Sequence, residues 1–178
     1  MFWTSLQQFG TQGVGFIVSL ILARLLLPAE FGLIAMIAVF IGMGSRLLDA
    51  GLGQSLIRTE NPNQEDYSTV FYFNLVGSVL IYFGVFALAP FIASFYNQES
   101  LTSIIRWYSI TFVINAFSIV QFARLTKVLD FKTQMKVSLP SVFIGGIVGI
   151  VLAYSGFGVW SLVWMAVIKS LTSTTQLW

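Results

Sequence analysis

The sequence predicts an all-α integral membrane protein with six transmembrane helices. Of its 178 residues, 57% are hydrophobic and only 9% are charged, whereas a soluble domain carries roughly 25% charged residues. The apolar residues form long continuous segments instead of the alternating pattern of a membrane β-barrel. At about 20 residues per span there is little room for a soluble domain, so we expect residues 1–178 to form a single transmembrane domain.

Six apolar segments follow one another, at about 3–27, 31–57, 69–94, 101–122, 138–154 and 158–178. The first lacks the basic start and the small-residue cleavage site of a secretory signal, so it is expected to be retained as a span. Pro90 should kink the third span near its outer end. A polar connection at 123–137 separates the fourth and fifth spans, and Pro140 is expected in the first turn of the fifth.

The basic residues beside the spans predict the orientation of the chain. The connections on one side of the membrane hold five of them, Arg58, Arg124, Lys127, Lys132 and Lys136, and the other side holds two, Arg24 and Arg106. Because cytoplasmic connections carry the excess of Lys and Arg, we expect the N-terminus in the cytoplasm. The 123–137 connection is then either a basic amphipathic segment at anionic headgroups or a solvated loop.

Several classes of function are disfavoured by composition. The chain has no Cys and no His and only seven Asp and Glu residues, which argues against disulfides, thiol catalysis, haem ligation and metal cages. Its nine Lys and Arg residues are scattered, with a net charge of +2, so no surface for nucleic acid is expected. No glycine-rich stretch has the pattern of a phosphate-binding loop. We therefore expect a transporter or channel, not an enzyme, with no cofactor.

Span two carries the most informative polar stripe. Gly42, Arg46, Asp49 and Gly53 are spaced four, three and four residues apart, so they share one helical face. A charged side chain in hydrocarbon costs at least about 2.5 kcal/mol. We expect the stripe to line a hydrated cavity in which Arg46 offers its guanidinium to an anionic substrate group. The alternatives are an Arg46–Asp49 pair that only holds helices together, or an Arg46 that reaches the headgroups.

Two further cations are candidates for the same cavity. Lys169 lies about eleven residues after Gly158, near the middle of the bilayer, and no charged partner is visible in its own helix. It is expected to face another helix or a wet cavity, unless it reaches the membrane surface as a lysine near the helix end. Arg24, near the outer end of span one, is either a cavity residue or an interfacial anchor.

Uncharged polar residues also recur on single helical faces. In span four such a face carries Asn115 with Tyr108, Thr111 and Ser118, and in span three Asn74 lies one turn from Ser78. These side chains either line a pathway or join helices by hydrogen bonds.

Span five carries small residues at every fourth position, at Ser141, Gly145, Gly149 and Ala153. Such a ladder predicts close approach of a neighbouring helix.

Motifs along nearly the whole chain carry a family resemblance. They are residues 21–33, with Ala23-Arg24-Leu25, Pro28 and Glu30-Phe31-Gly32, followed by residues 49–57, 68–75, 95–97 and 156–162. Together they resemble the polysaccharide-transport (Wzx-type) branch of the multidrug/oligosaccharidyl-lipid/polysaccharide flippase superfamily. The greatest similarity is to exporters of colanic-acid and lipopolysaccharide (O-antigen) repeat units.

The resemblance implies two six-helix lobes around a cationic central cavity. Such proteins move an undecaprenyl-diphosphate-linked oligosaccharide across the bacterial inner membrane, from the cytoplasmic to the periplasmic leaflet. Arg24, Arg46 and Lys169 would supply positive charge, although only Arg24 and the Asp49 segment match family patterns. Members are more than twice as long as this chain, which therefore resembles an N-terminal lobe. A C-terminal lobe would be its partner, together with membrane lipids, and we expect the isolated lobe not to translocate substrate.

Two other functions remain open at this stage. The chain is alternatively a non-transporting membrane scaffold or assembly subunit, in which the polar stripes join helices. A third hypothesis is a small-molecule exporter of the same superfamily that uses Asp49 in ion coupling. Complementation of a polysaccharide-deficient strain and a drug-resistance assay separate these hypotheses, because the scaffold predicts neither activity.

Overall fold

The computed structural model describes residues 2–48, 56 and 63–178. These residues form helices and no strand, which confirms the all-α fold class. The helices are α1 (Phe2–Leu25), α2 (Pro28–Leu48), α4 (Gln64–Phe95), α5 (Ser100–Tyr108), α6 (Ile110–Lys127), α7 (Phe131–Tyr154) and α8 (Val159–Leu177).

Five segments of the described chain are long and apolar enough to cross a membrane, namely α1, α2, α4, the α5–α6 pair and α7. This is the pattern of a multi-pass membrane protein. α8 lies where the sixth span was expected, but its second half carries Lys169 and several Ser and Thr residues. Because α8 packs against α2, α5, α6 and α7, much of its surface is turned toward other helices.

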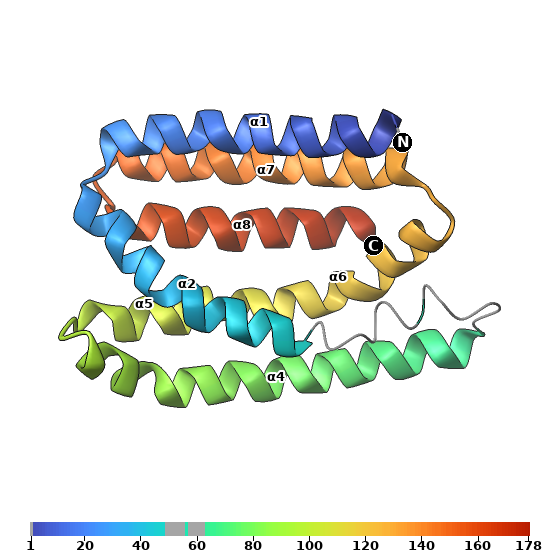
Figure 1. Cartoon of the computed structure of the whole chain (residues 1–178), viewed down its shortest axis with the longest axis horizontal. Coiled ribbons are helices and arrows are strands. Elements are labelled where there is room, and N and C mark those ends of the chain that lie inside the picture. Colours follow the sequence, from blue (N-terminus) through green and yellow to red (C-terminus); the bar gives the residue numbers. More distant parts are fainter. Residues whose placement is uncertain (1, 49–55, 57–62) are drawn as a thin grey trace.

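The helices form a layered bundle (Figure 1). α1 and α8 both lie beside α7, α6 follows beyond α8, and α4 lies at the far edge. α2 crosses the bundle obliquely, and the N- and C-termini lie at the same end (Figure 1). The most extensive packing joins α7 to α8 and α1 to α7, so α7 is the helix on which α1 and α8 are both held.

The small-residue ladder on α7 explains this packing. A Cβ atom added at Gly145 would lie 2.9 Å from both the Cβ of Lys169 and the carbonyl oxygen of Met165. One added at Gly149 would lie 3.0 Å from the Cβ of Met165. Side chains larger than hydrogen would therefore separate α7 from α8, and the predicted close approach is confirmed.

A dry core closes one end of the bundle, near the α4–α5 and α7–α8 turns. We call this cluster the apolar plug. It is made of buried residues from α2, α4, α5 and α8, namely Ile37, Ala89, Ile92, Ala93, Leu101, Ile104, Ile105 and Val163. Its aliphatic side chains are held together by exclusion from water and by close packing.

The polar connection expected at 123–137 is shorter than predicted, because helix continues through most of these residues. α6 reaches Lys127 and α7 begins at Phe131. The first turn of α7 is capped by Asp130, whose carboxylate accepts hydrogen bonds from the backbone N–H of Thr133 at 3.1 Å and from its hydroxyl at 2.7 Å. α7 therefore starts earlier than its apolar stretch, and Pro140 lies inside the helix instead of in its first turn.

Candidate functional site

A polar cavity of about 300 Å³ lies between α2, the α5–α6 pair and α8. Apart from Lys169, its polar lining residues are Ser45, Tyr108, Thr111, Asn115, Ser170 and Ser173. The cavity begins one helical turn beyond the apolar plug, because Ile41 follows Ile37 and Tyr108 follows Ile104 at four-residue spacing. The plug therefore closes the cavity toward the α4–α5 end of the bundle.

Lys169 brings the positive charge to this cavity. Its Cβ lies against Gly145, so the approach of α7 fixes where the side chain leaves α8. Lys169 is exposed, and no ion-pair partner is found for it within residues 2–48, 56 and 63–178. A charged ammonium halfway along a helix that packs within an apolar bundle requires water or an anion beside it. The cavity, with its hydroxyl and amide groups, provides space for either.

Asn115 joins the two walls of the cavity. The hydroxyl of Ser170 on α8 donates a short hydrogen bond to the side-chain oxygen of Asn115 on α6, and Thr174 donates to the carbonyl of Ile114 at 3.2 Å. In the described part of the chain the amide nitrogen of Asn115 has no hydrogen-bond partner. This group can donate to a phosphate or hydroxyl oxygen in the cavity.

Hydroxyl groups near the α5–α6 junction bond to backbone carbonyls in the last turn of α5. Ser109, which is fully buried, donates to the carbonyl of Arg106 at 3.0 Å, and Thr111 donates to that of Tyr108 at 2.7 Å. Back-bonding of this kind bends helices. Tyr108 and Thr111 both line the cavity, so the junction between α5 and α6 lies at the cavity wall, where irregular backbone is tolerated in a membrane.

The structure brings together two of the six residues expected to line a cavity, Asn115 and Lys169. Arg24 and Arg46 are exposed, in the last turns of α1 and α2, and do not line the polar cavity. Asn74 is buried at 2% exposure and donates to the carbonyl of Val70 on its own helix at 2.9 Å. Asp49 lies outside the described residues, and so does any pairing with Arg46.

Three polar lining residues were not singled out from the sequence. Ser45 lies one turn after Ile41 on α2, and Ser170 and Ser173 follow Ala166 at four- and seven-residue spacing on α8. This helical periodicity was a usable signal, since it places polar residues beside Lys169 on one face. In the described residues no cluster of three or more His, Cys, Asp or Glu side chains could hold a metal ion.

Comparison with known proteins places the chain among those of polysaccharide biosynthesis. Residues 21–178 match the polysaccharide biosynthesis protein family. The chain is 27% identical over 176 residues to the succinoglycan biosynthesis transport protein ExoT of Rhizobium meliloti. The aligned region covers 99% of this chain and 36% of that protein.

Two further relatives are matched over shorter regions. The lipopolysaccharide biosynthesis protein WzxC of Escherichia coli is 24% identical over 80% of this chain and 29% of its own length. The teichuronic acid biosynthesis protein TuaB of Bacillus subtilis is 30% identical over 53% of this chain and 20% of its own length. The chain thus spans about a third of the length of the curated relatives it matches, or less. No solved structure matches it significantly.

Proposed function

Because this chain belongs to the polysaccharide biosynthesis protein family, we propose that it forms the N-terminal lobe of a flippase for lipid-linked oligosaccharides. The resemblance found in the sequence is confirmed at the level of the family. The proposed substrate is an oligosaccharide repeat unit on undecaprenyl diphosphate, and the proposed location is the bacterial inner membrane. A second lobe would supply the other wall of the pathway.

The observation that carries this proposal is the pairing of Lys169 with a polar cavity inside an apolar bundle. An anionic diphosphate needs a cation and hydrogen-bond donors to leave water. Lys169 supplies the charge, while the Asn115 amide and the Ser173 hydroxyl supply hydrogen-bond donors, and the Ser45 hydroxyl already donates to the carbonyl of Ile41 at 2.9 Å. These groups bind and orient an anion, and no arrangement for bond-breaking chemistry is needed, so we propose transport instead of catalysis.

The apolar plug supports a direction of entry. If the N-terminus is cytoplasmic, as the basic residues predict, the α4–α5 end of the bundle is periplasmic. The plug then closes the cavity on the periplasmic side, and substrate enters from the cytoplasmic leaflet. We assign the exposed Arg24 and Arg46, and Asp49 with them, to a central cavity between the two lobes. The buried Asn74 is retained as a candidate whose role in packing is the competing explanation.

The test is complementation of a strain that lacks its own exporter, with the chain supplied in the form its genome encodes. Lys169→Met should reduce surface polysaccharide by about tenfold or more, since a charged hydrogen bond contributes about 1.5–3 kcal/mol. Lys169→Arg should retain much of the activity, because it keeps the charge. Lys136→Met is the matched control, since Lys136 is exposed on α7 and does not line the polar cavity.

The readouts are surface polysaccharide, lipid-linked repeat units retained in the inner leaflet, and protein level in the membrane. Normal export by Lys169→Met at normal protein level would contradict the site. Drug resistance conferred by the protein in the same strain would instead favour the small-molecule exporter. The absence of both activities in the unmodified protein would favour a scaffold.

A further inference from the structure

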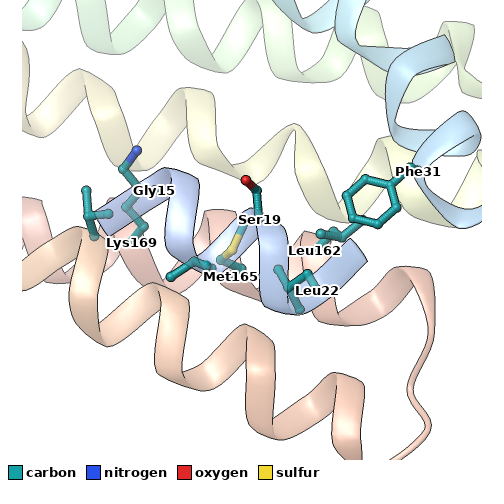
Figure 2. A pocket seen from close by; sticks show the side chains of 9 residues that line it. Gly15, Ser19, Leu22, Phe31, Leu162, Met165 and Lys169 are labelled. Carbon is teal, nitrogen blue, oxygen red and sulfur yellow. The ribbon is translucent and has the colours of Figure 1, made fainter. Parts of the chain in front are cut away.

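A second cavity adjoins Lys169, on the side of α8 that faces α1 and α7. This apolar pocket has a volume of about 150 Å³ and is enclosed by α1, α7 and α8, with Phe31 of α2. Figure 2 shows Lys169 at one end of the pocket and Phe31 at the other. Most of the remaining lining is aliphatic, including Leu22, Leu162 and Met165.

The pocket exists because α1 and α8 pack on α7 instead of on each other. A Cβ atom added at Gly146 would lie 2.5 Å from Cγ2 of Val18 on α1, and one added at Gly145 would meet Lys169 on α8. Two close approaches to one helix leave a space between the two outer helices. Ser19 lines that space, but its hydroxyl donates to the carbonyl of Phe16 at 2.8 Å, so its hydrogen bond is made within α1.

Lys169 is the residue that the apolar pocket and the polar cavity have in common. Lys169 therefore borders a polar space on one side and an apolar space on the other. A polyprenyl-linked diphosphate has the same order of parts, since its anionic group lies directly between a polar headgroup and a hydrocarbon tail. In a glycerophospholipid, by contrast, polar glycerol ester groups separate the phosphate from its tails.

We propose that the apolar pocket holds the isoprene unit nearest the phosphate while Lys169 holds the phosphate itself. This inference rests on the proposed function and adds that the lobe recognises the lipid carrier as well as the headgroup. The size fits, because an apolar cavity of about 150 Å³ holds a molecule as large as benzene, which is comparable to one five-carbon unit. The pocket is too small to hold a packed helix from another protein segment.

Two glycines on α1 provide a matched pair of variants. Gly15 lines the pocket, whereas Gly13 does not, and a Cβ atom added at either position meets nothing within 4 Å. Gly15→Leu should place its side chain in the pocket, because the added Cβ meets no atom there. Gly13→Leu makes the same change in helix propensity on the same helix, so it controls for effects on folding.

The experiment measures binding of inorganic pyrophosphate, geranyl diphosphate and a short-chain phosphatidic acid to the full-length protein in detergent. Geranyl diphosphate should bind at least about tenfold more tightly than pyrophosphate, since burial of two methylene groups suffices for that factor. Gly15→Leu should abolish this advantage and leave pyrophosphate binding unchanged. Gly13→Leu should keep the advantage, and Lys169→Met should weaken both diphosphates.

The outcomes separate this inference from the proposed function. If Gly15→Leu keeps the full preference for geranyl diphosphate, the tail site is refuted while the headgroup site stands. Equal sensitivity of phosphatidic acid to Gly15→Leu would refute selectivity for a tail attached directly to phosphate. Failure of the unmodified protein to bind any diphosphate would overturn the proposed function and the tail site with it. A photo-crosslinker at Ser19 should label geranyl diphosphate, and labelling of polypeptide alone would also refute the proposal.

Discussion

Replacement of Gly145 by alanine tests whether the approach of α7 to α8 positions Lys169. The added methyl carbon would lie 2.9 Å from the Cβ of Lys169 and 2.9 Å from the carbonyl oxygen of Met165. Carbon atoms in favourable contact are separated by about 3.5–4.0 Å. α8 must therefore move away from α7 by roughly half an ångström or more, because the Met165 oxygen belongs to its backbone.

The expected magnitude follows from two opposing effects. Overpacking of this kind costs about 1–3 kcal/mol, whereas replacing glycine by alanine inside a helix contributes about 0.8–1.0 kcal/mol of stability. Gly84→Ala on α4 has the second effect alone, since its added Cβ meets nothing within 4 Å. Gly145→Ala should therefore be less stable than Gly84→Ala by about 1–3 kcal/mol, the overpacking cost alone.

The assay is reversible unfolding of the protein in mixed micelles with a denaturing detergent, followed by circular dichroism. Export activity is measured in parallel, because displacement of α8 also moves Lys169 relative to Asn115. We expect activity to fall in Gly145→Ala and to persist in Gly84→Ala. Equal stability and equal export for the two variants would refute the view that this contact sets the cavity.

The remaining predictions concern the cavity wall, the second candidate cation, the helix cap and the isolated lobe. Asn115→Leu removes the acceptor for Ser170, so unfolding should show a loss of about 0.6–2 kcal/mol, and export should fall. Arg46→Ala should lower export at normal protein level if Arg46 faces substrate between the lobes, and unchanged export would remove it from the site. The pKa of Asp130 lies below its ordinary 3.8. The largest cause is the hydrogen bond from the Thr133 hydroxyl, the next is the one from the Thr133 backbone N–H, and nearby lysines contribute less. The cap therefore stabilises the start of α7 fully when the pH is above the pKa that Asp130 has in the unfolded chain. This stabilisation is lost as the pH falls through the lower pKa that Asp130 has in the folded protein. Hydrogen exchange should show fraying of α7 below about pH 4, and Asp130→Asn should remove that dependence while keeping the cap. Residues 1–178 expressed alone should fail to restore export in the complementation strain.

The all-helical membrane fold could be predicted because composition and segment length leave few alternatives. The contact between α7 and α8 was also predictable, since glycine at every fourth position serves close packing in a membrane. The length of the α6–α7 connection was not predicted correctly, because polarity was taken to end the helices. Asp130 followed by Thr133 was the relevant signal, as an N-cap residue allows a helix to begin in polar sequence.

The site was predictable only in part, for a geometric reason. Periodicity shows which residues share a face of one helix, but it does not show which faces of different helices meet. Asn115 and Lys169 were each recognised alone, and their meeting across α6 and α8 depends on tertiary packing. Asn74 has the same residue type and a similar position in its span, yet its amide bonds to its own backbone.

The apolar plug also determines where the electric field of the membrane acts. If the cavity is hydrated as proposed, it carries little of the voltage, and the potential would fall mainly across the apolar layer that includes Ile37, Leu101 and Val163. An anion beside Lys169 has then not yet crossed the field. On the proposed function and orientation, with the cytoplasm negative, each negative charge of the diphosphate that passes the plug outward would be favoured by about 2.3 kcal/mol per 100 mV, so the voltage would help drive the substrate across.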